Sequence, residues 1–271
     1  MKINKNIVFM GAGKMGEALM SYFVKSGIVA PSKVTAVDAD WKKAAALAKR
    51  YGIKSTPDKS KALKSADIVF LAVKPQQMPE LLDEIRPFIT NKMLVISIAA
   101  GLTTRWLESR LSKGAAVIRT MPNTPAMVGL GATGISKGRK VTGAQVKIAK
   151  QLFDMAGKTA VLAEDKIDSV TAVSGSGPAY VFFLAEMLER AAVELGLSKV
   201  TAAEFARQTV AGAGKMIEHF ADTPVSELRK NVTSPGGTTE AALAHLQKSD
   251  FYDIFFIALK KAKERAQELS K

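Results

Sequence analysis

The architecture of the N-terminal part is indicated most strongly by Gly11-Ala12-Gly13-Lys14-Met15-Gly16. This run follows the apolar segment Ile7–Met10 and opens an amphipathic stretch, the context in which a G-x-G-x-x-G pattern indicates a dinucleotide-binding loop. The first glycine permits a tight turn, the second lets a pyrophosphate approach the backbone, and the third lets helix and strand pack closely. Free N–H groups and the dipole at the helix start attract the phosphates. The run therefore predicts a phosphate-binding turn.

Short apolar runs alternate with amphipathic stretches up to about Asp165. The apolar runs predict strands at Ile7–Met10, Val34–Val37, Ile68–Val73, Leu94–Ile98, Val117–Thr120 and Thr159–Leu162. The amphipathic stretches predict helices at Lys14–Ser26, Trp41–Tyr51, Met78–Phe88, Thr104–Leu111 and Ala144–Ala156. Because the strands are apolar on both faces, they predict a parallel sheet covered by helices on each side, an α/β Rossmann-like domain.

Residues 166–271 carry no strand signal and predict helices. We expect breaks between them at Ser174–Gly177, Gly196–Ser198, Asp222–Thr223 and Ser234–Gly237. The helix expected at Pro178–Leu195 is apolar almost all round, so it should be buried within a larger domain or against another subunit. We place a dinucleotide-binding domain at residues 1–163 and a helical dimerisation and substrate-binding domain at residues 164–271. The expected assembly is a homodimer or a higher oligomer built from dimers.

Composition excludes several classes of function. The chain has no cysteine and only two histidines, which argues against disulfides, thiolate-bound metals, a cysteine nucleophile and a Ser-His-Asp triad, and we expect no metal site. The net charge of +14 suits anionic ligands, but no arginine-rich run or aromatic array indicates a nucleic-acid partner. No apolar stretch is long enough for a membrane span or a signal peptide. We therefore expect a soluble cytoplasmic protein that acts on a small molecule.

Asp38 ends the second predicted strand, 22 residues beyond Gly16. An acidic side chain at this place accepts hydrogen bonds from the adenosine ribose and repels a 2′-phosphate. The alternative is a solvated residue at a strand end. Up to this point the residues indicate a dinucleotide-binding domain and name no substrate.

Further segments narrow the function. They are Ala72-Val73-Lys74-Pro75, Ile98-Ala99-Ala100-Gly101, Met121-Pro122-Asn123-Thr124-Pro125, Ser174-Gly175-Ser176-Gly177-Pro178-Ala179-Tyr180 and Ser234-Pro235-Gly236-Gly237-Thr238-Thr239. In this order and spacing, over essentially the whole chain, they resemble the pyrroline-5-carboxylate reductase family. The resemblance implies reduction of pyrroline-5-carboxylate to L-proline by NADPH or NADH, the last step of proline biosynthesis. It also implies an N-terminal dinucleotide fold and a C-terminal helical domain that interlocks with a second subunit.

The resemblance implies roles for individual residues. Coenzyme contacts fall on Gly11, Ala12, Gly13, Lys14, Met15, Gly16, Asp38, Lys59, Ala72, Val73, Lys74, Pro75, Ile98, Ala99 and Ala100, with Asn123 near the nicotinamide. Substrate contacts fall on Ser234, Gly236, Gly237, Thr238 and Thr239, and Thr239 stands where the family is proposed to touch the imine nitrogen. Many NADPH-preferring members of the family carry a small hydroxyl residue in place of Asp38, and many carry Asn in place of Lys59. These two departures concern coenzyme preference, with Asp38 favouring NADH, and leave the reaction unchanged.

The chemistry agrees with the residues. A protonated imine is already an electrophile, so no strong general acid is needed, and the coenzyme carries the hydride. The run at residues 234–239 stands before a helix expected at Glu240–Gln247, where amides and hydroxyls form an anion cradle for a carboxylate, although a glycine turn with a threonine N-cap would look the same. His219 and His245 are interpreted as surface or interface residues. Two alternatives remain: a 2- or 3-hydroxyacid dehydrogenase, which usually needs a lysine or histidine acid that is not evident here, and a coenzyme-sensing protein without turnover.

Overall fold

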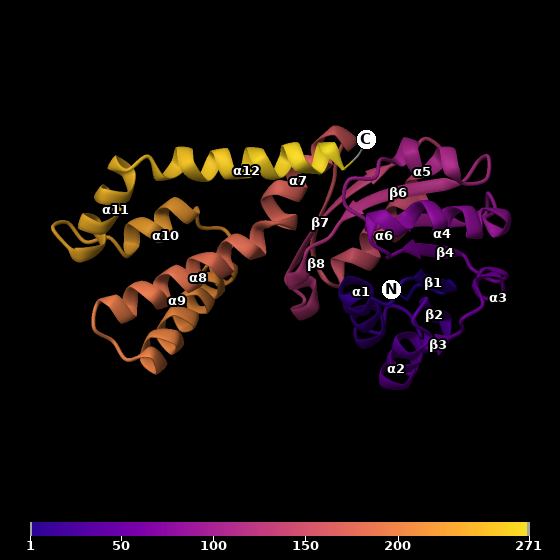
Figure 1. Cartoon of the computed structure of the whole chain (residues 1–271), viewed down its shortest axis with the longest axis horizontal. Helices are drawn as coiled ribbons and strands as arrows, with labels where there is room; N and C mark the ends of the chain where they lie inside the picture. The colour runs from indigo at the N-terminus through magenta and orange to yellow at the C-terminus, as the bar shows by residue number, and fades with distance from the viewer. Residues whose placement is uncertain (1, 270–271) are drawn as a thin grey trace. The chain divides into compact units, whose positions relative to one another are not determined.

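The computed structural model describes residues 2–269, which form two compact units (Figure 1). The first unit contains residues 2–176 and 262–269, and the second contains residues 177–261. The two units are separated by where contacts between residues of the same chain are dense or sparse, and not by function. The boundary expected between residues 163 and 164 stays a prediction.

The first unit is built on one mixed sheet of eight strands within the described residues. The strands are β1 (Ile7–Met10), β2 (Val34–Val37), β3 (Lys54–Ser55), β4 (Ile68–Leu71), β5 (Leu94–Ser97), β6 (Ala116–Met121), β7 (Gly131–Lys137) and β8 (Gly157–Val161), in the order β3-β2-β1-β4-β5-β6-β7-β8. The first six strands follow the order 3-2-1-4-5-6 of a dinucleotide-binding sheet. The predicted strands are confirmed to within a few residues, and the predicted α/β Rossmann-like class is confirmed with them.

The sheet departs from the sequence prediction at two places. The short strand β3 and the seven-residue strand β7 were not expected, and β7 runs antiparallel to β6, with Ile118 opposite Lys137. The expectation of an entirely parallel sheet is therefore wrong at this edge. The link between β6 and β7 holds only the short 3-10 helix η4 (Thr124–Val128), which is too little chain for the crossover that a parallel neighbour requires.

Helices cover both faces of the sheet. In the first unit they are α1 (Lys14–Lys25), α2 (Trp41–Tyr51), α3 (Lys59–Leu63), α4 (Met78–Ile85), α5 (Thr104–Arg110), α6 (Gly143–Asp154) and α7 (Ile167–Val170). Phe9 on one face stacks on Phe70 with ring centroids 4.4 Å apart, while its neighbours Val8 and Met10 are buried in a second cluster on the other face. Alternate side chains of one strand thus fill both apolar layers, as the uninterrupted apolar runs predict.

A buried ion pair fixes α7 to the sheet. The guanidinium of Arg119 on β6 is 2% exposed and lies 2.6 Å from the carboxylate of Asp168 on α7. Glu164 adds a second carboxylate at 3.7 Å, and its two oxygens accept from the backbone and hydroxyl of Thr104 at 2.6 Å each. Two carboxylates compensate the buried charge of Arg119, whose Nε has no hydrogen-bond partner within the described residues. This pairing favours one arrangement of these segments.

The break expected at Ser174–Gly177 is present as an irregular turn with a bend at Ser176. Residues Thr171–Gly175 form a π-helical turn, in which the N–H of Ser176 donates to the carbonyl of Thr171 at 2.8 Å. Proline at position 178 lacks the N–H that an α-helix would donate to the carbonyl of Ser174, which accounts for an irregular turn at this place.

The second unit consists of helices, in agreement with the sequence. They are α8 (Gly177–Glu194), α9 (Lys199–His219), α10 (Val225–Asn231), α11 (Thr238–Lys248) and α12 (Phe251–Glu268), whose last turns belong to the first unit. No helix among residues 2–269 is both long enough and apolar enough to cross a membrane.

Helix α8 is apolar and yet exposed in the single chain. None of its residues is buried, and the side chains of Phe182 and Phe183 are 63% and 59% exposed. Apolar surface of this kind on one element marks an interaction site. Contacts within its own chain therefore do not bury this helix as the sequence led us to expect.

Candidate active site

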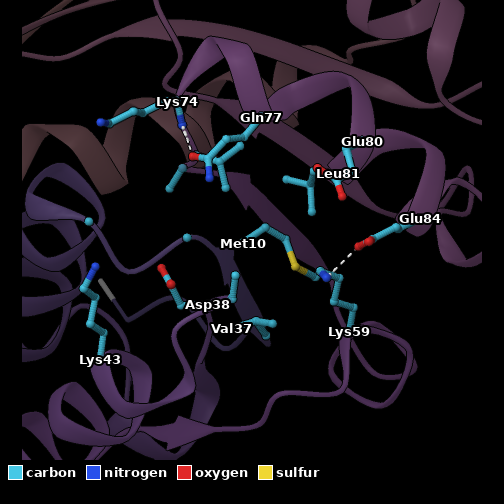
Figure 2. A pocket seen from close by; sticks show the side chains of 15 residues that line it. Met10, Val37, Asp38, Lys43, Lys59, Lys74, Gln77, Glu80, Leu81 and Glu84 are labelled. Atoms are coloured by element: carbon cyan, nitrogen blue, oxygen red, sulfur yellow. Dashed lines mark hydrogen bonds and ion pairs between the residues drawn. The ribbon is translucent and has the colours of Figure 1, made fainter.

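A cavity of about 600 Å³ lies at the carboxyl ends of β1, β2 and β4 (Figure 2). Seven of the residues expected to contact a coenzyme line it: Gly11, Gly13, Asp38, Lys59, Ala72, Val73 and Lys74. In open α/β sheets, ligands bind at this edge, where the strand order reverses. The structure thus brings the connections that follow β1, β2 and β4 together around one cavity.

The three glycines of the loop have three different reasons to be glycine. Gly11 has a φ of +115°, and a Cβ there would lie 2.5 Å from the carbonyl oxygen of Ala72. A Cβ on Gly16 would lie 2.8 Å from the carbonyl oxygen of Gly11, so this glycine allows α1 to pack on the loop. Gly13 has open space around its Cβ position and lines the cavity. The roles assigned from the sequence agree with this geometry.

Helix α1 offers backbone donors at the cavity. Gly13 is its N-cap and supplies no side-chain cap, and the first turn begins with Lys14 and Met15. The N–H groups of a first helical turn have no partner inside the helix. A diphosphate can therefore accept from them, favoured by the positive end of the helix dipole.

Asp38 is tied to the glycine loop itself. One carboxylate oxygen accepts from the N–H of Ala12 at 2.6 Å, and the other accepts from the N–H of Asp40 at 2.9 Å. This side chain is partly buried at the end of β2. It therefore shapes the loop as well as placing a negative charge at the cavity.

Lys59, the first residue of α3, reaches across the cavity to α4. Its Nζ lies 2.5 Å from a carboxylate oxygen of Glu84. Figure 2 marks this ion pair with a dashed line. The helix that carries Lys59 is capped by Asp58, and the N–H of Lys61 and the hydroxyl of Ser60 hold the pKa of Asp58 below its ordinary value. The sequence did not indicate Glu84, since it is one of several acidic residues on the polar side of an amphipathic helix.

The segment after β4 contributes backbone to the cavity wall. Ala72 and Val73 line the cavity, and Lys74 precedes the 3-10 helix η2 (Pro75–Gln77). The N–H of Lys74 faces the side-chain oxygen of Gln77 at 3.4 Å. Gln77 also lines the cavity and was not expected from the sequence.

Other expected coenzyme residues do not line this cavity. They are Ala12, Lys14, Met15, Gly16, Pro75, Ile98, Ala99, Ala100 and Asn123. Ala12, Lys14 and Pro75 are sequence neighbours of lining residues, while Ile98, Ala99 and Ala100 follow β5. The coenzyme contacts assigned to them stay predictions.

Asn123 uses its side chain within the first unit. Its amide nitrogen donates to the carbonyl of Ser174 at 3.0 Å, and its amide oxygen accepts from the N–H of Ala132 at 2.8 Å. A Cβ on Gly175 would lie 2.5 Å from the terminal carbon of Met121. The structure therefore joins the segment Met121–Pro125 to the Ser174–Gly177 segment, to which the sequence assigned no role.

The expected substrate loop lies in the second unit, directly before α11. The helix begins at Thr238, two residues earlier than expected, and its N-cap is Gly237, not a threonine. Ser234, Gly236 and Thr238 are exposed, and Gly237 and Thr239 are half-buried.

One donor of this loop is already occupied. The N–H of Gly236 donates to the carboxylate of Glu240 at 2.7 Å. The amides and hydroxyls at Thr238 and Thr239 remain at the start of the helix as donors for an anionic group. The substrate contacts assigned to residues 234–239 stay predictions.

Comparisons with known proteins agree with both halves of the chain. Residues 6–101 match the family model described as NADP oxidoreductase coenzyme F420-dependent. Residues 164–269 match the model for pyrroline-5-carboxylate reductase dimerisation. The second match identifies the helical part as a dimerisation domain.

Relatives more than 35% identical to this chain over nearly its whole length include pyrroline-5-carboxylate reductases. A pyrroline-5-carboxylate reductase of Corynebacterium melassecola is 39% identical over 268 residues, covering 98% of each chain. A solved structure of the enzyme from Coxiella burnetii is 37% identical with a TM-score of 0.92, covering 99% of this chain and 100% of that one. The pyrroline carboxylate reductase of Plasmodium falciparum, solved with NADP bound, is 29% identical with a TM-score of 0.87 and covers both chains completely. The chain therefore belongs to the pyrroline-5-carboxylate reductase family.

Proposed function

We propose that this protein reduces pyrroline-5-carboxylate to L-proline with NADPH or NADH, the last step of proline biosynthesis. The observation that carries the proposal is the glycine loop, whose open Gly13 and uncapped helix α1 face a cavity at the reversal point of the sheet. Similarity over the whole chain to reductases of this name supports the choice of substrate.

The residues of the first unit fit a dinucleotide. Backbone N–H groups of residues 13–16 would hold its diphosphate, and Asp38 would face the adenosine ribose. When bound, the reduced nicotinamide supplies a hydride. In this proposal Asn123 lies near the nicotinamide, as expected from the sequence, and its hydrogen bonds to Ser174 and Ala132 hold it in place.

The second unit supplies the substrate loop. The substrate carboxylate would accept from the amides and hydroxyls at the start of α11, where the helix dipole favours a negative charge. The hydroxyl of Thr239 would form a hydrogen bond with the ring nitrogen and orient the imine. A protonated imine is already an electrophile, so no strong general acid is needed.

We further propose a homodimer, or an oligomer built from dimers, formed through the second unit. The support is the exposed apolar surface of α8 together with the match to a dimerisation domain. A cytoplasmic location and the absence of a nucleic-acid partner stay predictions from the sequence.

The test is oxidation of NADH and NADPH in the presence of pyrroline-5-carboxylate. We expect steady turnover with the imine. Binding of coenzyme without turnover would favour a sensing protein. Turnover with 2- or 3-hydroxy acids and oxidised coenzyme, but none with the imine, would favour a hydroxyacid dehydrogenase.

A further inference from the structure

The adenosine side of the cavity carries charges of both signs. Lys43, Lys59, Asp38, Glu80 and Glu84 all line it. NADH and NADPH differ only in a 2′-phosphate on the adenosine ribose, so the balance of these charges bears on the choice of coenzyme.

Lys59 is placed to meet a 2′-phosphate. Asp38 marks the ribose position at the end of β2. Lys59 follows β3, which pairs with β2, and it lines the same cavity as Asp38. A cation at this place would attract the phosphate if its charge were uncompensated.

The charge of Lys59 is compensated. Its Nζ lies 2.5 Å from Glu84, and the two side chains are 33% and 46% exposed. Lys43 also has an acidic neighbour, since its Nζ lies 3.8 Å from Asp40. A phosphate that approaches Lys59 therefore meets the carboxylate of Glu84 as well.

We propose that Glu84 is a specificity-determining residue, which disfavours the 2′-phosphate of NADPH by pairing with Lys59. The inference rests on the proposed function, because it requires a nicotinamide dinucleotide in this cavity. Asp38 acts in the same direction, and its carboxylate is held in place by the N–H groups of Ala12 and Asp40. Glu84 differs from Asp38 in leaving the glycine loop untouched when it is replaced.

The experiment compares two small ligands on the unliganded enzyme by calorimetry: adenosine 2′,5′-bisphosphate and AMP. Glu84→Gln should tighten binding of the bisphosphate relative to AMP by roughly 1.5- to fivefold, the range set by a partly exposed ion pair. The gain should shrink as salt is raised, since exposed charges are screened over about 10 Å at 0.1 M. The ratio of kcat/KM for NADPH over NADH should rise in the same variant.

Glu80→Gln is the matched control. Glu80 lines the same cavity and has no ion pair within residues 2–269, so its replacement removes the same charge without releasing Lys59. The control should change the ratio of the two dissociation constants, for the bisphosphate and for AMP, less than Glu84→Gln does. When Lys59 is already replaced by Gln, Glu84→Gln should not tighten binding of the bisphosphate relative to AMP.

Two results would overturn the inference. An unchanged ligand ratio in Glu84→Gln would show that the pair does not select the coenzyme. A weaker bisphosphate complex in that variant would show that Glu84 orients Lys59 toward the phosphate. Failure of the parent enzyme to bind either AMP or the bisphosphate would overturn the coenzyme site itself, and the proposed function with it.

Discussion

The side-chain amide of Asn123 donates to the backbone carbonyl of Ser174 at 3.0 Å, across 51 positions of sequence. The residue four positions beyond Ser174 is Pro178, which has no N–H to give to that carbonyl. Asn123 thus replaces a donor that the chain lacks, at the point where the π-helical turn leads into α8. The amide oxygen of Asn123 accepts from the N–H of Ala132, so one side chain connects the loop after β6 to two further segments.

Replacing Asn123 with alanine should leave the carbonyl of Ser174 and the N–H of Ala132 without these partners. The expected cost is about 1–3 kcal/mol of stability for a buried group left unpaired. Thermal unfolding measures it, with Asn91→Ala as the control because Asn91 is exposed. Asn123→Asp keeps an acceptor for Ala132 but loses the donor to Ser174, so it should not restore the parent. An unfolding temperature like that of Asn91→Ala would contradict the role.

Replacing Gly13 with alanine should leave the fold intact and weaken coenzyme binding. A Cβ at Gly13 meets nothing of the protein within 4 Å, but it occupies the space where a phosphate must approach. We expect roughly tenfold weaker binding, or about 1.4 kcal/mol.

Gly16→Ala provides the contrast, because its Cβ would lie 2.8 Å from the carbonyl of Gly11 and should distort the loop and lower stability. Calorimetry with NADH and thermal unfolding separate the two effects. If Gly13→Ala bound coenzyme as tightly as the parent, the loop would not hold the diphosphate.

Thr239→Val should lower kcat/KM for pyrroline-5-carboxylate by roughly 10- to 100-fold. The change preserves the shape of the side chain and removes one hydrogen bond to the ring nitrogen, which is worth on the order of 1–3 kcal/mol in a closed site. Thr239→Ser retains the hydroxyl and should recover most of the rate. Steady-state kinetics at saturating NADH make the comparison, and a parental rate in Thr239→Val would remove the assigned role.

The sheet of the first unit was largely predictable because its strands are uninterrupted apolar runs, and only burial on both faces explains such runs. Strand β7 was not predicted because its apolar pattern is interrupted by Gly131, Thr133, Gly134 and Ser136. Glycine also disfavours strands. Its pairing with β6 depends on tertiary contacts that local propensity does not contain.

Only the part of the site that is formed by a local sequence motif could be predicted. The glycine loop is a contiguous pattern, and the structure gives each of its glycines the expected surroundings. Glu84 and Ser174 were not predictable as partners of Lys59 and Asn123, because each pairing joins segments that only the folded chain brings together. The sequence placed a break directly before Pro178, but nothing local identifies the side chain that compensates for the missing N–H of this proline.

The exposed apolar surface of α8 predicts that a charged residue placed on it disrupts assembly. Phe183 is 59% exposed in the single chain, and Phe183→Glu would bury a charge if that surface is covered by a second copy. Light scattering at low micromolar concentration should show a dimer, or a multiple of it, for the parent and smaller species for the variant. Phe88→Glu, at a residue 41% exposed in the first unit, should leave the assembly unchanged. A parent enzyme that is monomeric and active would contradict the dimer.

The central claim is tested most directly by product analysis with the purified enzyme, pyrroline-5-carboxylate and limiting NADH or NADPH. We predict that L-proline forms in proportion to the coenzyme oxidised, and that Thr239→Val slows both together while its coenzyme binding persists. Coenzyme oxidation without L-proline, or a parent enzyme that binds coenzyme and leaves the imine unreduced, would contradict the account.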